Sequence, residues 1–275
     1  MRPHLRAGGG SRDRGRAAGR GVRPGERDLG LPGSGAMTDL LTLRGVTVGY
    51  GRHHPVLHAI DLAVGGGEVV GLVGMNGAGK STLLKAICGG VKLREGTISY
   101  DGQDVSGLGT PELVRRGMSI LAEGHRVIRP LTVEENLQIA TMSLRGSAVR
   151  RRLAASRELI DELFPVLHQR RTQLAGLLSG GEQQMLSMAR AIIEDPKLLL
   201  LDEPSLGLAP LVVDRIYSSL SAFRERGVSL LVVEQNSTRV ADICTRMVVL
   251  RDGRITATGS PAELVGAALT SAYFG

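Results

Sequence analysis

The stretch GMNGAGKS, residues 74–81, follows directly on the apolar run Val69–Val73 and precedes a segment with helical patterning at 81–88. A short, continuously apolar run is typical of a parallel strand that is buried on both faces. Glycines between such a strand and a helix let successive backbone N–H groups point at a phosphate group, beside the positive end of the helix dipole. The stretch therefore predicts a phosphate-binding loop in an α/β fold.

Two side chains of this loop carry its chemistry. Lys80 is expected to reach the β- and γ-phosphates of a nucleotide, and Ser81 is expected to ligate Mg²⁺. The alternative is a chance glycine-rich turn, which the strand before the loop and the helix after it disfavour. The residues expected to contact the nucleotide are Gly74, Met75, Asn76, Gly77, Ala78, Gly79, Lys80, Ser81 and Thr82.

A second apolar run, LLLLDE at 198–203, ends in two carboxylates. Sheets of α/β folds bind ligands at the carboxyl ends of their strands. We therefore expect Asp202 to hold Mg²⁺ through water and Glu203 to be the general base for an attacking water. Exposed acids at the end of an ordinary strand are the alternative, which the phosphate loop elsewhere in the chain disfavours.

The motif LSGGEQ, residues 178–183, predicts the start of a helix with unusual features. Ser179 and Glu182 have the spacing of a capping box. Gly180 and Gly181 in the first turn each cost about 1 kcal/mol in helix propensity. A helix N-terminus without side chains exposes its N–H groups and its dipole to an anion. An ordinary capped helix, the alternative, does not account for the glycines.

Together with Asp202, this motif resembles the signature of ABC ATPases, which P-loop kinases and GTPases lack. The resemblance covers Met37 to Gly275 and implies that the nucleotide is ATP, hydrolysed with Mg²⁺. It implies an α/β fold with a P-loop NTPase sheet core, an N-terminal antiparallel β region and an inserted helical subdomain at about 117–176. In this family the signature, here Ser179–Glu182, meets the γ-phosphate bound by the opposite subunit, so the resemblance implies a dimer.

Four further positions acquire a role from the resemblance. Tyr50 lies where the family places an aromatic ring against the adenine, with a core tyrosine as the alternative. Glu123 stands at the family's usual glutamine, which senses the γ-phosphate and contacts the membrane subunits, so it is an implied contact of the nucleotide and Mg²⁺. Gln235 replaces the usual histidine and cannot take up a proton as histidine does. Ala209 replaces an aspartate. Because Gln235 cannot accept a proton, Glu203 is expected to be the only general base. The expected catalytic residues are then Glu203, Gln235 and Lys80.

Several short motifs together resemble one subfamily, the second ATPase of branched-chain amino-acid importers, with close relatives that serve amides and urea. These motifs are EGHR at 123–126, LTVEEN at 131–136, EPSLGLAP at 203–210, VEQN at 233–236 and SAYFG at 271–275. The resemblance implies a related ATPase or a second copy as partner, two separate membrane subunits, an extracytoplasmic binding protein, and a peripheral place on the cytoplasmic face of the membrane. A soluble ABC clamp acting on ribosomes or DNA is the alternative, although no second cassette or long coiled-coil insertion separates Lys80 from Ser179.

The net charge of +7 is concentrated at the start of the chain. Residues 1–36 contain eight Arg and three acidic residues, which gives +5, together with ten Gly and three Pro. Such a composition buries too little apolar surface to fold. We expect a disordered tail or a start site placed too early, with an RNA- or lipid-binding arm as the alternative. No nucleic-acid partner is expected for the remainder, whose charge is only +2.

Deleting residues 1–36 is therefore expected to leave both the folding and the ATPase activity of the chain unchanged. The measurement compares the melting temperature and the hydrolysis rate of residues 37–275 with those of the full chain. A large drop in melting temperature would mean that the segment docks on the rest of the protein.

The rest of the chain alternates strand and helix patterns. Asp101-Gly102 and Asp252-Gly253 predict hairpin turns, Thr110 and Thr132 predict helix N-caps, and Gly227 predicts a helix end. No apolar run approaches the roughly 20 residues of a membrane span, so none is expected. The two cysteines, at positions 88 and 244, lack CxxC spacing and are expected to be reduced core thiols.

Overall fold

The computed structural model describes residues 39–51, 54–122, 127–142 and 147–264, with the backbone alone for 147–150. The chain divides into two units, residues 1–36 and 37–275. The predictions for residues 1–36, for Glu123 and for the motif at 271–275 lie outside the described residues. The fold below is that of the second unit.

A six-stranded sheet forms the centre of this unit, in the order β10-β9-β3-β8-β7-β6. Strands β6, β7, β8, β3 and β9 run parallel to their neighbours, and β10 pairs antiparallel with β9. Its strands are β3 (Val69–Val73), β6 (Met118–Leu121), β7 (Leu198–Asp202), β8 (Ser229–Glu234), β9 (Arg246–Arg251) and β10 (Arg254–Gly259). The predicted α/β core is confirmed.

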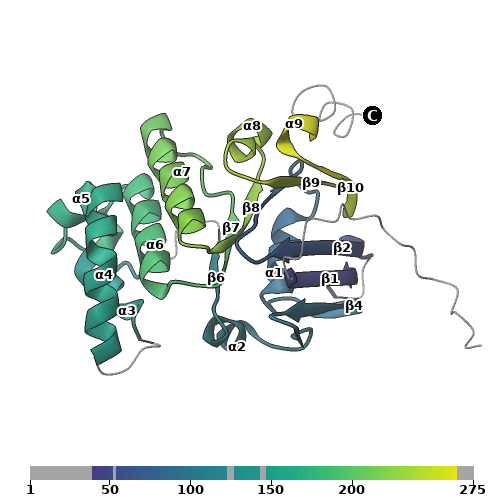
Figure 1. Ribbon diagram of the computed structural model, residues 1–275, viewed down its shortest axis with the longest axis horizontal. Coiled ribbons are helices and arrows are strands. Elements are labelled where there is room, and N and C mark those ends of the chain that lie inside the picture. Colours follow the sequence, from purple (N-terminus) through teal and green to yellow (C-terminus); the bar gives the residue numbers. More distant parts are fainter. Residues whose placement is uncertain (1–38, 52–53, 123–126, 143–146, 265–275) are drawn as a thin grey trace, which may run out of the picture. The chain divides into compact units, whose positions relative to one another are not determined.

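The two faces of this sheet lie in two separate cores, because alternate side chains of a strand point to opposite faces. Leu199 and Leu201 pack with helices α6 (Gly180–Glu194), α7 (Pro210–Glu225) and α8 (Ser237–Ala241). Leu198 and Leu200 pack with helix α1 (Lys80–Ile87) and with a second sheet. Figure 1 shows α6 and α7 on one side of the central strands and α1 on the other.

The second sheet is antiparallel, in the order β2-β1-β4-β5, and it is the predicted N-terminal β region. Its strands are β1 (Asp39–Val48), β2 (Leu57–Gly65), β4 (Leu93–Tyr100) and β5 (Gln103–Asp104). The predicted hairpin turns are confirmed: Asp101 and Asp252 both have positive φ and each precedes a glycine with positive φ. That conformation matches the twist of the strands that the turns join.

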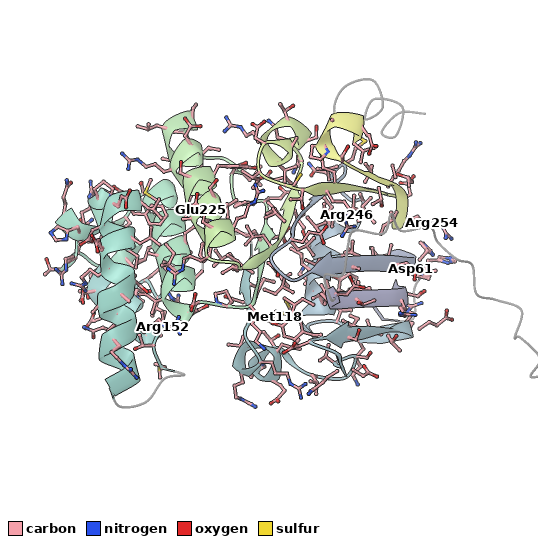
Figure 2. The ribbon with its side chains drawn as sticks, in the orientation of Figure 1. Asp61, Met118, Arg152, Glu225, Arg246 and Arg254 are labelled. Atoms are coloured by element: carbon pink, nitrogen blue, oxygen red, sulfur yellow. The ribbon has the colours of Figure 1, made fainter. Side chains whose placement is uncertain are left out.

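The helical region begins later than the sequence predicted. The stretch 117–176 was expected to be mostly helical, but Met118, labelled in Figure 2, starts the sheet strand β6, which pairs with β7. Four residues are too few for periodicity to separate a strand from a helix. The helices that follow pack against α6: α3 (Val133–Ile139), α4 (Ser147–Leu163) and α5 (Pro165–Gln169). The 3₁₀ turn η1 (Ala175–Leu177) leads into α6 itself.

Helix ends follow the predicted chemistry with one exception. Thr132 and Glu135 form the expected capping box of α3. The prediction for Thr110 was wrong, because the N-cap of α2 (Thr110–Arg115) is Gly109. The Thr110 hydroxyl instead donates to the Cys88 carbonyl oxygen at 2.7 Å, so a long-range partner competes with capping. Gly227, with φ 77°, follows the end of α7 as predicted.

Both cysteines are buried and neither forms a disulfide, as expected. Burial raises the pKa of Cys244 to about 11, which keeps this thiol protonated at neutral pH. Cys244 is therefore not a candidate for catalysis. Of the helices in the described ranges, none has the length and apolar character to span a bilayer. The last described helix is α9 (Pro261–Leu264).

Candidate functional site

The phosphate loop connects β3 to α1 and is shaped by glycines. Gly77 and Gly79 have φ values of 83° and 104°, in the left-handed region that side chains other than glycine rarely adopt. A Cβ atom at Gly79 would come within 2.7 Å of the Leu57 side chain, and one at Gly74 would come within 2.4 Å of the Leu250 carbonyl oxygen. Close packing at Gly74 and Gly79 and the backbone conformation at Gly77 and Gly79 therefore disfavour any larger residue at these three positions.

Lys80 lies inside this loop, with only 4% of its surface exposed. Its Nζ donates hydrogen bonds to the carbonyl oxygens of Gly74, at 2.8 Å, and Met75, at 3.1 Å. The same atom lies 3.3 Å from the Glu203 Oε1 atom. The ammonium group is thus held at the centre of the loop.

Ser81 and Asp202 meet, although they lie 121 positions apart in the chain. The Ser81 hydroxyl, on the first turn of α1, donates to Asp202 Oδ1, at the end of β7, at 3.2 Å. Hydroxyl and carboxylate oxygens are the ligand types that Mg²⁺ prefers. The two residues fit the predicted metal position.

Glu203 is held by contacts with three other residues. Its φ of 47° is unusual for a residue other than glycine, and its N–H donates to the Val233 carbonyl oxygen at 2.9 Å. The Oε2 atom accepts a hydrogen bond from Gln235 Nε2 at 2.7 Å, while Oε1 faces Lys80. Strained backbone of this kind is concentrated at functional sites. The predicted catalytic residues Lys80, Glu203 and Gln235 are therefore brought together.

Tyr50 is 48% exposed, which rules out the alternative of a core tyrosine. Its hydroxyl lies 3.3 Å from the Thr82 hydroxyl oxygen, one residue beyond Ser81 on α1. An exposed aromatic ring anchored at the edge of the phosphate loop is suited to stack on a base.

The glycine-containing signature begins α6 as predicted. The Ser179 hydroxyl accepts from the Glu182 N–H at 3.4 Å, and the Glu182 carboxylate accepts from the Ser179 N–H at 2.8 Å. Gly180 is exposed. Gly181 has a second reason to be glycine, since a Cβ atom there would lie 2.9 Å from the Val212 side chain on α7. The close packing of α6 against α7 therefore also requires glycine at position 181, which we had explained from the sequence by anion binding alone.

The structure separates the signature from the phosphate loop within one chain. Helix α1 belongs to the core that includes the antiparallel sheet, whereas α6 belongs to the core on the other face of the central sheet. Within the described residues, the side chains of Ser179 and Glu182 make polar contacts with each other's residue and with Arg170. The signature end therefore remains open to a group from outside the chain.

A cluster of three residues beside the site was not predicted from the sequence: Glu234, Ser205 and Tyr217. Glu234 is buried at the end of β8, and its Oε1 atom accepts hydrogen bonds from the Ser205 N–H and from the Tyr217 hydroxyl, each at 3.2 Å. The signal in the sequence was an acidic residue at the end of an apolar strand, directly before Gln235.

A cavity of about 370 Å³, lined by residues 75–78 and 249–252, also lies beside the phosphate loop.

Comparison with known proteins accounts for this arrangement. The family model of the ABC transporter matches residues 57–206, which contain the phosphate loop, the signature and the Asp202–Glu203 pair. The chain belongs to the ABC transporter ATPases. It is the ATP-binding subunit of a transporter and hydrolyses ATP to drive transport.

Two curated relatives and one solved structure resemble this ABC ATPase over most of its length. The high-affinity branched-chain amino acid transport ATP-binding protein BraG of Pseudomonas aeruginosa is 40% identical, over 82% of this chain and 95% of that protein. The lipopolysaccharide export system ATP-binding protein LptB of Haemophilus influenzae is 34% identical, over 82% and 92%. A structure of the ATP-binding subunit of an ABC transporter is 30% identical, with a TM-score of 0.73, over 85% and 97%. The predicted fold is confirmed.

Proposed function

We propose that this ABC ATPase powers the uptake of branched-chain amino acids from a peripheral position on the cytoplasmic face of the cell membrane. The observation that carries the proposal is the 40% identity with BraG across nearly all of that protein, against 34% with LptB. The VEQN motif at 233–236, which places Gln235 on Glu203, supports the same subfamily. Two separate transmembrane permease subunits and an extracytoplasmic binding protein complete the transporter.

In the proposed mechanism the phosphate loop binds ATP and Lys80 contacts its β- and γ-phosphates. Ser81 and Asp202 would hold Mg²⁺, which would supply positive charge against the phosphate oxygens. Tyr50 stacks on the adenine and Glu123 senses the γ-phosphate.

Glu203 takes the proton from the attacking water, because it is the carboxylate directed toward Lys80. Gln235 fixes this carboxylate through its amide N–H and offers no site for the proton.

The proposal places each ATP between two subunits. One chain supplies the phosphate loop, and the other supplies the N-terminus of α6, whose exposed Gly180 leaves N–H groups free to face the γ-phosphate. The proposed partner is a related ATPase subunit, with a second copy of this chain as the alternative. An isolated chain is then expected to bind ATP and hydrolyse it slowly.

Introducing a carboxylate at Gly181 is expected to block the partner's site and spare ATP binding by the same chain, since like charges repel. Gly181→Asp alone would also clash with Val212, at 2.9 Å. The informative variant is therefore Gly181→Asp combined with Val212→Ala, which removes the clashing methyl groups. Titration measures ATP binding by the monomer, and hydrolysis is measured after mixing with the wild-type partner.

The control for this experiment is Val212→Ala alone, which should retain both activities. Loss of ATP binding by the double variant as a monomer, with the control intact, would contradict the shared site. The geometry requires residue 181 to act only across the interface.

The solute is tested by reconstitution with the permease and binding-protein subunits that the neighbouring genes are expected to encode. Leucine, isoleucine or valine is expected to stimulate ATP hydrolysis in proteoliposomes, whereas urea and short amides are not. Stimulation by urea or an amide alone would assign the chain to a related importer. Absence of permease genes, together with binding to ribosomes or DNA, would support a soluble ABC ATPase outside transport.

A further inference from the structure

We infer that Glu234 is a positioning residue, which fixes the loop after Glu203 and so sets the geometry of the Glu203 carboxylate. The inference rests on the proposed role of Glu203 as the base. Among the described residues, the Glu234 side chain has no hydrogen bond to the phosphate loop or to Glu203 itself. Its effect on hydrolysis must therefore pass through the loop.

An acidic residue at this position is costly, which indicates a specific use. Glu234 is 3% exposed and follows the apolar residues Leu230–Val233 on β8. Desolvation raises the pKa of its carboxyl group, although hydrogen bonds from Ser205 and Tyr217 favour the ionised form. In the part of the chain that the structure describes, Glu234 has no ion pair. An apolar side chain would avoid this desolvation, so packing does not explain the residue.

Glu234 holds the backbone two residues beyond Glu203. Its Oε1 atom accepts from the Ser205 N–H at 3.2 Å, and the turn also contains hydrogen bonds from Leu206 N–H to the Glu203 carbonyl oxygen and from Leu208 N–H to that of Ser205. Glu203 lies at the start of this turn with its φ of 47°. Removing the Glu234 carboxylate would leave the Ser205 N–H without this acceptor. The turn that maintains the strained backbone conformation of Glu203 would then be released.

Two consecutive residues, the last of β8 and the one directly after it, thus hold the same turn at two points. Gln235 binds the Glu203 side chain at 2.7 Å, and Glu234 binds the backbone at Ser205. Tyr217 on α7 adds a third connection through its hydroxyl, which donates to the same Glu234 oxygen. The carboxylate therefore joins the end of β8, the turn and α7, the helix that begins directly after it.

Displacement of the turn should affect the chemical step and not nucleotide affinity. The ammonium of Lys80, the hydroxyl of Ser81 and the ring of Tyr50 come from β3–α1 and from the segment after β1. The Glu234 backbone pairs with Val73 of β3, and a change of side chain leaves that pairing in place. The Glu234 side chain itself has no hydrogen bond to these segments among the described residues. A misplacement of about 1 Å at a reacting group can cost about 100-fold in rate.

The test compares kcat and KM for MgATP in the full-length protein. Glu234→Ala is expected to lower kcat by about 10- to 100-fold with KM unchanged. Glu234→Gln should restore most of the lost rate, because its amide oxygen accepts the same two hydrogen bonds. Tyr217→Phe, which removes one donor, should give a smaller decrease in kcat. Val232→Ala, two positions earlier on β8, controls for destabilisation and should lower the melting temperature without lowering kcat.

The outcomes separate this inference from the proposed function. Glu203→Gln is measured in parallel, and if it turns over normally, the base assignment is wrong. If it is inactive while Glu234→Ala keeps its kcat, the base assignment stands and the positioning role is wrong. Failure of Glu234→Gln to restore kcat, or a rise in KM equal to the loss in kcat, would also overturn the inference. If Glu234→Ala does not fold, an unchanged kcat in Tyr217→Phe overturns it instead.

Discussion

Replacement of Glu203 by glutamine is expected to lower the rate of ATP hydrolysis by about 100- to 10,000-fold while MgATP still binds. Glutamine keeps the size of the side chain but cannot accept the proton of the attacking water. Gln235, the neighbour at 2.7 Å, also has an amide and offers no substitute base. Removing the negative charge beside Lys80 should favour binding of the anionic nucleotide, since Glu203 then no longer repels it.

The Glu203→Gln protein should therefore accumulate as an ATP-bound dimer that size-exclusion chromatography detects. Single-turnover hydrolysis and ATP titration measure the two effects separately. Glu225→Gln provides a matched control, because Glu225, labelled in Figure 2, is exposed at the last position of α7, and the first position of that helix follows the Glu203 turn. Turnover of Glu203→Gln close to that of the control would mean that another group activates the water.

The parts of the site that the sequence predicted are those determined by short segments. The apolar run of β3, the glycines of the phosphate loop and the Ser179–Glu182 capping box each depend on residues within about one helical turn or one strand. The pairing of Ser81 with Asp202 was predictable for a different reason, since parallel strands deliver their carboxyl ends to one edge of a sheet. Residue patterns within single segments, together with the rule that parallel strands end at one edge of a sheet, were sufficient to predict these features.

The features that the sequence did not predict depend on contacts between distant segments. Gly181 is adjacent to Val212 only because α6 and α7 pack on the same face of the sheet. Thr110 failed as a cap because the Cys88 carbonyl oxygen competes for its hydroxyl. The role inferred for Glu234 requires Tyr217 and Ser205 to converge from a helix and a turn. No pattern within a single segment carries such information.

Replacement of Lys80 by alanine is expected to lower ATP affinity at least about 100-fold, which corresponds to about 3 kcal/mol, the value of a strong charge-assisted hydrogen bond. The ammonium group is nearly enclosed and is the cation that the loop holds at its centre. Without it, the negative charge of Glu203 would face the γ-phosphate with no compensating cation from residue 80. ATP should therefore lose more affinity than ADP, which lacks the γ-phosphate.

Two comparisons distinguish loss of this charge from damage to the loop. Lys85→Ala removes an exposed lysine from the same helix and should keep wild-type affinity for both nucleotides. Lys80→Ala combined with Glu203→Gln removes the opposing carboxylate as well, and it should recover part of the ATP affinity if electrostatic repulsion causes the loss. Equal losses for ATP and ADP in Lys80→Ala, with no recovery in the double variant, would mean that the lysine shapes the loop through the Gly74 and Met75 carbonyls and does not bind the γ-phosphate.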